Sequence, residues 1–333
     1  MADNIAYLAV LTAYAEDCKA LRAEFLGSAG GFSGAEIWRI HASAGLLCLR
    51  KWPREHPSSE DLQRVHALLQ HVAQHGFARV PLPRQTRDGQ TLVVHEGHLW
   101  DLTCWLPGLA DFHQSPSATK LRAAMTALAQ FHRAAASLGG VELPHGPSPG
   151  IQQRVEQLRQ WLAGGLEELE AAIRPETWPE LESRARRILR LVPNLAGDVV
   201  VLLEACRSPN VPLQHCIGDV WRDHVLFQGD RVVGLVDFGS SRIDNVTVDV
   251  ARLLGSMAGD DGPSWQVGLA AYQEVRPLDE AELLLVEAFD RSAVLMSGLN
   301  WTDWIYRQGR VFVSGDAIPR RMDEILLRLE NMR

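Results

Sequence analysis

The chain has 333 residues, of which 46% are hydrophobic and 22% are charged, and its formal net charge is -8 at pH 7. This length exceeds the usual size of one compact core, so two domains or lobes are expected. The net negative charge disfavours nucleic acid or an anionic membrane as the main partner, because binding to phosphate requires clustered Lys and Arg. The composition is that of an ordinary globular protein, which excludes a disordered or fibrous class.

The cysteines and the first residues bear on the compartment. The 5 cysteines form no CxxC pair or regular framework, which is typical of buried thiols in a reducing compartment. The first twenty residues place acids beside an apolar stretch and lack a basic region, so they predict an amphipathic helix and no signal peptide. No apolar run reaches the length that spans a membrane. We therefore expect a cytoplasmic protein.

The first third of the chain has the pattern of strands. Glycines in residues 30–34 precede two short apolar runs, 37–40 and 46–49, which predict strand, turn and strand. A helix is predicted from Ser58, with apolar residues at helical spacing until Gly76 ends it. Residues 92–106 predict a hairpin. Together these elements indicate a small, strand-rich lobe with one helix.

The rest of the chain has mostly helical periodicity. The exception is a pair of short apolar runs around Gly229-Asp230, which predicts a hairpin. Helical patterns cover residues 121–131, 155–169, 248–257, 280–299 and 320–332. A mostly helical second lobe follows from this pattern.

The strongest motif is a pair of aspartates at the two ends of that hairpin. Asp219 lies in the stretch CIGDVWRDHVLF, and Asp237 follows the second apolar run of the hairpin. Phosphoryl transfer requires a carboxylate beside the acceptor hydroxyl and oxygen ligands for divalent cations, and the two aspartates suit these tasks. Either aspartate alone is explained as well by a common Gly-Asp turn. The pair together with its hairpin favours the functional interpretation.

Two weaker features fit a nucleotide. The glycine-rich segment 30–34 could cover phosphates with its backbone amides, although such hairpin tips usually bind nothing. Cys48 and Arg50 share one face of a strand, so an adenine ring could pack beside the small Cys48 while Arg50 reaches the phosphates. Lys51 points to the other face and ranks below Arg50. A solvated edge charge explains Arg50 equally well.

With these motifs the chain resembles the aminoglycoside phosphotransferase family, small-molecule kinases of protein-kinase-like fold that include choline, homoserine and fructosamine kinase relatives. The segments that carry the resemblance are GGFSGAEIWRI, LLCLRKWP, HALLQHVAQHG, WLPG, ALAQFH, IGDVWRDHVLF and VDFGSSRIDNVTVDVARLLG. The resemblance implies an α+β, two-lobed fold. Residues 1–106 would form a β-rich nucleotide-binding lobe, and residues 107–333 a larger helical lobe with the catalytic loop and the acceptor site.

The resemblance also implies roles for single residues. Asp219 matches the catalytic aspartate, Asp237 the metal-binding aspartate, and Asp249 the helix aspartate that braces the catalytic loop. The implied contacts to ATP come from Gly30, Gly31, Ser33 and Gly34 over the phosphates, Arg50 at the phosphates, and Trp105 and Leu106 in the linker beside adenine.

Three positions depart from the family pattern. Ile217 replaces a histidine of the loop, and His66 stands where the helix usually supplies a glutamate to pair with the strand cation. His224 replaces the asparagine that holds the second metal. Mg²⁺ prefers hard oxygen ligands, whereas imidazole suits Mn²⁺ and later metals. An active enzyme could bind one metal at Asp237, use Mn²⁺ with His224, or recruit Asp223 as an oxygen ligand.

We expect an enzyme that transfers the γ-phosphate of ATP to a hydroxyl of a small molecule such as an aminoglycoside, an amino alcohol or a sugar, with Mg²⁺ or Mn²⁺. A nucleotide-binding pseudokinase and a scaffold without nucleotide are the alternatives. Acids in the last third are compatible with a cationic acceptor and equally with a solvated face, and tryptophans there could stack on a ligand or lie in the core. These residues are Asp260, Asp261, Asp279, Glu280, Glu282, Trp265, Trp301 and Trp304. The sequence does not set the oligomeric state.

Overall fold

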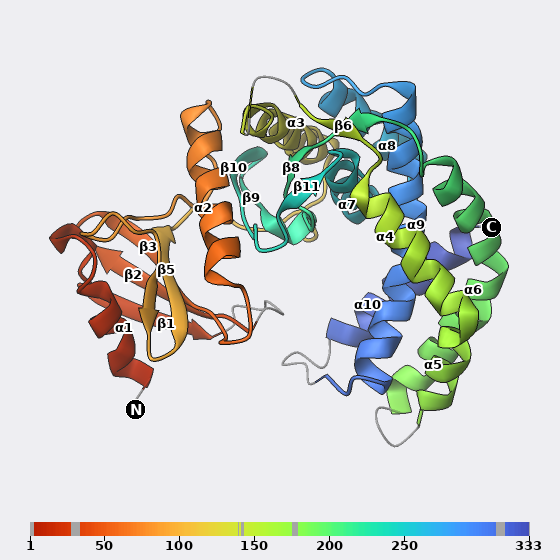
Figure 1. Ribbon diagram of the computed structural model, residues 1–333, viewed down its shortest axis with the longest axis horizontal. Helices are drawn as coiled ribbons and strands as arrows, with labels where there is room; N and C mark the ends of the chain where they lie inside the picture. The colour runs from red at the N-terminus through yellow and green to blue at the C-terminus, as the bar shows by residue number, and fades with distance from the viewer. Residues whose placement is uncertain are drawn as a thin grey trace. The chain divides into compact units, whose positions relative to one another are not determined.

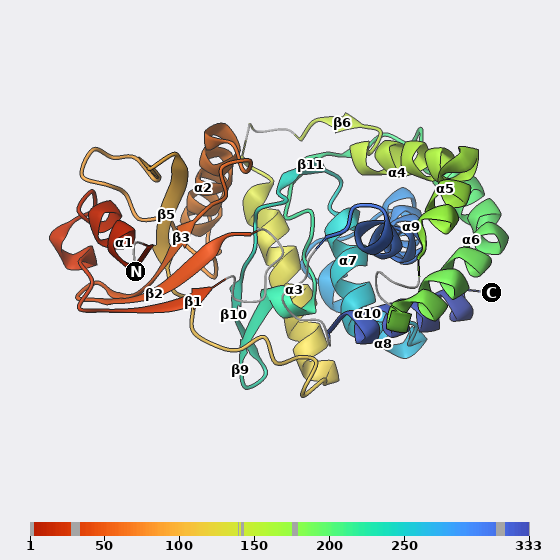
Figure 2. The ribbon, with the colours of Figure 1, turned by 90° about the horizontal axis from the view of Figure 1, so that it is seen from below.

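The computed structural model describes residues 3–27, 34–138, 140, 143–174, 179–310 and 317–332. The chain folds into two compact units (Figures 1 and 2). Unit 1 comprises Met1–Gly139 and Arg222–Ser241, and unit 2 comprises Gly140–Trp221 and Arg242–Arg333. Unit 1 carries an antiparallel sheet and unit 2 is mostly helical, so the expected α+β class is confirmed. The lobe boundary at residue 106 stays a prediction.

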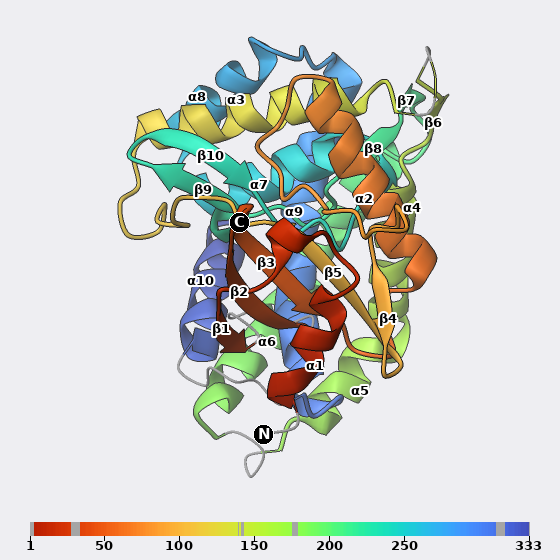
Figure 3. The ribbon, with the colours of Figure 1, turned by 90° about the vertical axis from the view of Figure 1, so that its left-hand side faces the viewer.

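The core of unit 1 is a five-stranded antiparallel sheet. Its strands are β1 (Arg22–Gly27), β2 (Glu36–Ala42), β3 (Gly45–Lys51), β4 (Val93–His95) and β5 (His98–Cys104). They lie in the order β1-β2-β3-β5-β4, which can be followed across Figure 3. The strands expected at residues 37–40 and 46–49 and the hairpin expected at residues 92–106 are all present. Consecutive strands that are joined by a short turn, such as β2 and β3, lie next to each other in the sheet.

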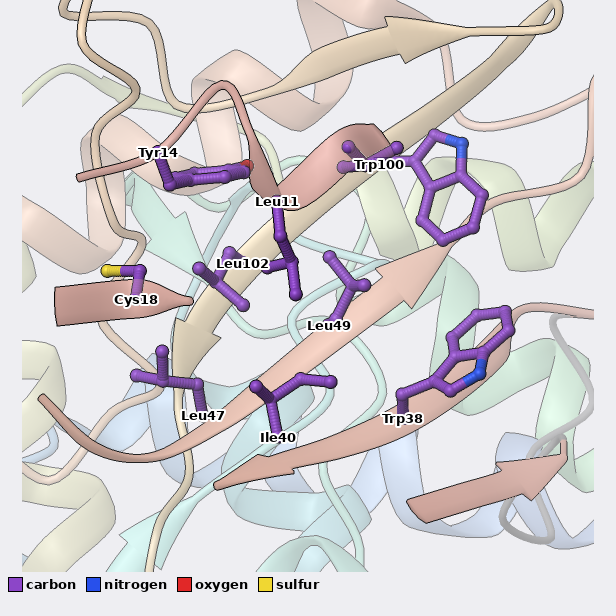
Figure 4. Close-up of a cluster of buried hydrophobic side chains, with 10 residues drawn as sticks. Leu11, Tyr14, Cys18, Trp38, Ile40, Leu47, Leu49, Trp100 and Leu102 are labelled. Carbon is purple, nitrogen blue, oxygen red and sulfur yellow. The ribbon is translucent and has the colours of Figure 1, made fainter. Parts of the chain in front are cut away.

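One face of this sheet packs against helix α1 (Asp3–Leu11). Alternate residues of β3 and β5 supply the core, among them Leu47, Leu49 and Leu102, because successive side chains of a strand point to opposite faces. Leu11 of α1 packs into the same cluster, and the rings of Trp38 and Trp100 stack at 5.3 Å between centroids (Figure 4). The 3-10 turn Glu16–Cys18 follows α1.

The other face carries helix α2 (Ser59–Gln74). Ser58 caps the helix, since its side chain accepts a hydrogen bond from the amide of Asp61 at 3.1 Å. Gly76, with φ of 92°, follows the C-cap and ends the helix where the sequence predicts. Leu62 and Leu69 are buried on the inner side of the helix. Cys48 and Arg50 point to this face of the sheet, away from Leu47 and Leu49.

A second group of elements completes unit 1. It consists of α3 (Ala118–Ala135), the 3-10 turn η3 (Arg222–His224) and the hairpin of β9 (Val225–Gln228) and β10 (Arg231–Leu235). The segment after β5 packs on this hairpin, and Leu109 and Phe227 exchange backbone hydrogen bonds of 3.0 and 2.8 Å. Gly108 has φ of 100°, and an added Cβ there would lie 2.7 Å from the carbonyl oxygen of Phe227. Only glycine fits this close approach.

Unit 2 is built around the long helix α9 (Glu280–Tyr306). Helices α6, α7 and α10 pack against it. Its helices are α4 (Pro149–Gln160), α5 (Leu166–Ala172), α6 (Pro179–Ala205), α7 (Thr247–Ala258), α8 (Gly262–Gln273), α9 and α10 (Ala317–Asn331). Its strands form two short antiparallel pairs, β6 (His145–Gly146) with β7 (Val211–Pro212), and β8 (Gln214–Cys216) with β11 (Arg242–Asp244).

The structure differs from the sequence-based expectation at two helices. The helix expected over 155–169 is interrupted, because Trp161–Gly165 forms a π-turn in which Gly164 has φ of 126°. The amphipathic helix expected from the first residues ends already at Leu11. Among the described residues, no helix combines the length and the apolar character needed to cross a bilayer.

Candidate active site

The loop that carries Asp219 is held by a buried carboxylate of unit 2. The loop follows β8, and helix α7 places the carboxylate of Asp249 beside the loop. The two oxygens of Asp249 accept hydrogen bonds from the amides of Ile217 (Oδ2, 2.6 Å) and Gly218 (Oδ1, 2.7 Å). This is the brace that the family resemblance implies for Asp249. Since the brace acts on backbone amides, Ile217 can replace a histidine here and be fully buried.

Arg252 orients the carboxylate of Asp219. Its Nε donates to Oδ1 of Asp219 at 2.8 Å. The Asp219 side chain is 51% exposed, so a ligand can reach it. Arg252 lies one helical turn after Asp249, so one face of α7 holds both the backbone and the side chain of the loop. Sequence reasoning missed Arg252, although its spacing from Asp249 was the available signal.

In unit 1, the β9-β10 hairpin brings His224 and Asp237 together. The amide of Val236 donates to the carbonyl of His224 at 3.0 Å, which closes the base of the hairpin. His224 Nε2 then lies 3.5 Å from Asp237 Oδ2. The imidazole is 14% exposed and the carboxylate 55% exposed, so the pair has one open side.

The backbone of Asp237 is held in an unusual conformation. Its φ is 65°, in the left-handed region that non-glycine residues rarely adopt. Such a conformation costs on the order of 1–3 kcal/mol and tends to occur at functional sites. The conformation therefore supports a functional assignment for Asp237.

The donor atoms of this pair fit a divalent cation. A nitrogen and an oxygen 3.5 Å apart can approach one ion from two sides. The mixed set favours Mn²⁺ over Mg²⁺, which prefers oxygen ligands alone. The alternative ligand Asp223 is exposed, and its Oδ1 lies 3.9 Å from Nε of Arg222. His224 is therefore the better candidate for the second ligand.

Arg50 of β3 lies beside an acid that the sequence did not single out. Its partner across the strand pair is Asp101 of β5, so both side chains project from the same face. Asp101 is 1% exposed. Its Oδ1 accepts a hydrogen bond of 2.7 Å from Trp52 Nε1, and its Oδ2 lies 3.5 Å from His66 Nε2. Lys51 faces the other way and pairs with Glu36 at 3.1 Å, as the strand alternation predicts.

The electrostatics of this group favour charged Arg50 and Asp101. Burial alone would raise the pKa of Asp101, but the charge of Arg50 and the hydrogen bonds from His66 and Trp52 outweigh it and lower the pKa. Burial would lower the pKa of Arg50, whereas the charge of Asp101, followed by those of Cys48 and Asp237, raises it. Asp101 therefore supplies a negative charge near both Arg50 and His66.

A small cavity adjoins this group within unit 1. Its volume is about 30 Å³, and its wall includes Arg50, Trp52, His66, Leu69, Asp101 and Asp237. Nε of Arg50 is buried and finds no acceptor among the described residues. The guanidinium thus keeps hydrogen-bonding capacity beyond what the protein uses.

The other residues expected at a nucleotide are only partly described. Gly30, Gly31 and Ser33 lie outside the described residues, and Gly34 is exposed with φ of 71°. The amide of Trp105 donates to the carbonyl of Leu46 at 3.0 Å, so this N–H is already used within the sheet. A contact from the linker to adenine would come from its other backbone groups, such as those of Leu106.

The acids of the last third are used within unit 2. Asp261 and Asp279 cap α8 and α9, and Asp279 forms a capping box with Glu282. Asp260 pairs with Arg328 at 2.9 Å, and Glu282 with Arg276 at 3.0 Å. These contacts explain the acids structurally. Trp265 donates from Nε1 to the carbonyl of Gly259, and the rings of Trp301 and Trp304 contact each other edge to face.

Curated relatives share most of the chain. The homoserine kinase of Methylobacterium nodulans is 27% identical over 292 residues, which cover 84% of this chain and 81% of that protein. The homoserine kinase of Agrobacterium fabrum is 27% identical over 272 residues, covering 80% and 76% of the two chains.

Solved structures of kinases share the fold. An AMP-bound spectinomycin phosphotransferase superposes with a TM-score of 0.65 at 11% identity, covering 94% of this chain and 93% of its own. An amicoumacin kinase in complex with AMP-PNP, Ca²⁺ and its ligand gives a TM-score of 0.64 at 13% identity, covering 99% and 93%. The sequence profile of the phosphotransferase enzyme family matches residues 25–284. The chain belongs to this family and is a phosphotransferase that acts on a hydroxyl group of a small molecule.

Proposed function

We propose that this phosphotransferase moves the γ-phosphate of ATP to the hydroxyl of a small amino alcohol, and that homoserine is the first acceptor to test. The observation that carries the proposal is the braced Asp219 loop, with Asp249 on its amides and Arg252 on its carboxylate. A carboxylate held in one orientation is what deprotonation of an acceptor hydroxyl requires.

Asp219 acts as the catalytic base. It accepts a hydrogen bond from the acceptor hydroxyl, orients its oxygen toward the phosphorus, and takes the proton as transfer proceeds. Arg252 holds Oδ1 and so limits rotation of the carboxylate. The half-exposed side chain leaves the carboxylate accessible to an acceptor.

His224 and Asp237 would hold the divalent cation. A bound cation would neutralise charge on the phosphate groups of ATP. Arg50 would contribute a second positive charge toward the phosphates. The family resemblance assigns the segment from Gly30 to Gly34 to the phosphates and the backbone of Trp105 and Leu106 to adenine. Mg²⁺ and Mn²⁺ are both candidates, and the imidazole favours Mn²⁺.

The choice of acceptor follows the sequence relatives. Homoserine kinases align with most of this chain at 26–28% identity, whereas the aminoglycoside kinases among the solved structures are at most 20% identical and share only the fold. An amino alcohol therefore ranks above an aminoglycoside or a sugar.

The test is an ATP-consumption assay with homoserine, choline, ethanolamine, an aminoglycoside and a sugar, each with Mg²⁺ and with Mn²⁺. Asp219→Asn is expected to lower kcat by roughly 10²–10⁴-fold, the usual contribution of a general base. Asp230→Asn, at the exposed turn of the hairpin, is the matched control and should keep full activity. Equal ATP consumption by wild type and Asp219→Asn contradicts the mechanism. Stimulation by the aminoglycoside or the sugar alone contradicts the acceptor.

A further inference from the structure

The buried acid opposite Arg50 lies on the neighbouring strand β5 and not on helix α2. The position of α2 nearest the group is His66, which is 2% exposed and supplies no carboxylate. A guanidinium removed from water needs a compensating anion. Asp101, the cross-strand partner of Arg50, is the buried acid on this face of the sheet.

We propose that Asp101 is a positioning residue that holds Arg50 in place for the phosphates of the nucleotide. The inference rests on the proposed function, because Arg50 is assigned to the phosphates there. It gives Asp101 a task that the sequence motifs do not assign.

The carboxylate of Asp101 is itself fixed. Trp52 donates to one oxygen at 2.7 Å, and His66 lies 3.5 Å from the other. The guanidinium of Arg50 packs over the ring of the same Trp52, at 4.9 Å from its centroid. One tryptophan therefore binds the anion with its N–H and the cation with its ring face, which sets the two charges in a defined geometry.

His66 completes the arrangement as a hydrogen-bond donor toward Asp101. Its Nδ1 lies 2.8 Å from the hydroxyl of Thr91. If Nδ1 accepts from that hydroxyl, the ring proton resides on Nε2 and points toward Asp101. His66, which departs from the family pattern, then donates a hydrogen bond to Asp101.

The first test is Asp101→Asn. Asparagine keeps the oxygen that accepts from Trp52, removes the charge, and places an NH2 group where the other oxygen faces His66. We expect KM for ATP to rise about tenfold with a smaller change in kcat, because Arg50 would contact the phosphates in the ground state as well. Asp111→Asn is the control, since Asp111 forms a separate ion pair of 2.7 Å with Lys120 in the same unit. Its KM should stay within twofold of wild type.

The second test moves the acid from the strand to the helix. In His66→Glu/Asp101→Asn, the carboxylate projects from α2 toward Arg50, and the variant should recover a third or more of the lost kcat/KM. His66→Glu alone buries two acids beside one cation, so this variant should be less stable than the wild type and less stable than the double variant. A purely structural role of Asp101 predicts no recovery in the double variant.

Binding measurements test the role of Asp101 if a variant is inactive for other reasons. Asp101→Asn should weaken ATP binding about tenfold and leave adenosine binding unchanged, because only ATP carries the phosphates. If Asp101→Asn does not fold, Trp52→Phe keeps the ring face and removes the N–H, and it should weaken ATP about threefold relative to adenosine.

Equal loss of ATP and adenosine, or an unchanged KM, overturns the inference. Failure of this inference can be distinguished from failure of the proposed function. If Asp101→Asn has the wild-type KM while Asp219→Asn has lost turnover, only the role of Asp101 is wrong. If Asp219→Asn turns over like wild type, the proposed function itself has failed.

Discussion

The guanidinium of Arg252 helps to orient the carboxylate of Asp219. Arg252 contacts the carboxylate directly, and its own side chain is 26% exposed. It also lies over the ring of Trp221, at 5.9 Å from the centroid. The packing restricts the arginine, and the arginine in turn restricts the carboxylate.

Arg252→Ala should therefore lower kcat by about ten- to a hundredfold, the cost of a misplaced catalytic group, with KM for ATP nearly unchanged. Arg252→Lys should retain part of the activity, because lysine offers a point charge without the planar donor geometry. Steady-state kinetics measure both. Arg291→Ala, which removes the exposed pair with Glu287, is the control. A wild-type kcat for Arg252→Ala would show that Asp219 needs no such support.

At the residue scale, the sequence supplied candidates but not their partners. The brace by Asp249 follows from the family resemblance, and the structure contains it. The family resemblance implies a counter-charge for Arg50 on α2, at the position that His66 occupies. The pairing of Arg50 with Asp101 depends on the register between β3 and β5, which a single sequence does not specify.

At the scale of elements, the linker after β5 is tied to the β9-β10 hairpin by a contact between backbones. The added Cβ of an alanine at position 108 would lie 2.6 Å from Val233 Cγ2 and 2.7 Å from the carbonyl oxygen of Phe227. The valine side chain can turn away, but the carbonyl belongs to a paired strand.

Gly108→Ala should lower the free energy of unfolding by about 2–4 kcal/mol, because backbone strain and steric overlap add. The matched control is Gly45→Ala, whose φ of 104° is similar but whose added Cβ meets nothing within 4 Å. Chemical denaturation of the two variants separates strain from overlap. Equal losses would mean that the close approach at Gly108 contributes nothing.

Helices and strands with a clear hydrophobic periodicity were predictable from the sequence. The residues at which they end were less predictable. The strands of the central hairpins and helix α2 lie where alternation and helical spacing place them. The helix expected over 155–169 is broken at Gly164, because two adjacent glycines permit a π-turn that apolar spacing does not reveal. The Gly108 contact joins segments more than a hundred residues apart, so no local pattern could indicate it.

At the scale of the whole molecule, the family resemblance is confirmed, and metal choice is the property most open to test. A ligand that binds only the folded state raises the free energy of unfolding by RT ln(1 + [L]/Kd), so the metal complex that binds more tightly stabilises the protein more at the same concentration. ATP with Mn²⁺ should therefore raise Tm more than ATP with Mg²⁺ at equal concentrations. His224→Asn replaces the imidazole by an oxygen ligand and should reverse the order. Thermal melts with each metal alone are the control. An unchanged metal order in His224→Asn would remove His224 from the metal site.

The division of the chain into units has a consequence for its synthesis. Unit 1 is discontinuous, because residues 140–221 of unit 2 separate its first part from the hairpin segment Arg222–Ser241. At ordinary translation rates these intervening residues take roughly 4 to 16 seconds to emerge. During that interval Leu109 lacks its backbone partner Phe227, and the surface that receives the hairpin stays open to water. The nascent chain therefore cannot complete unit 1 before residues 140–221 of unit 2 have left the ribosome.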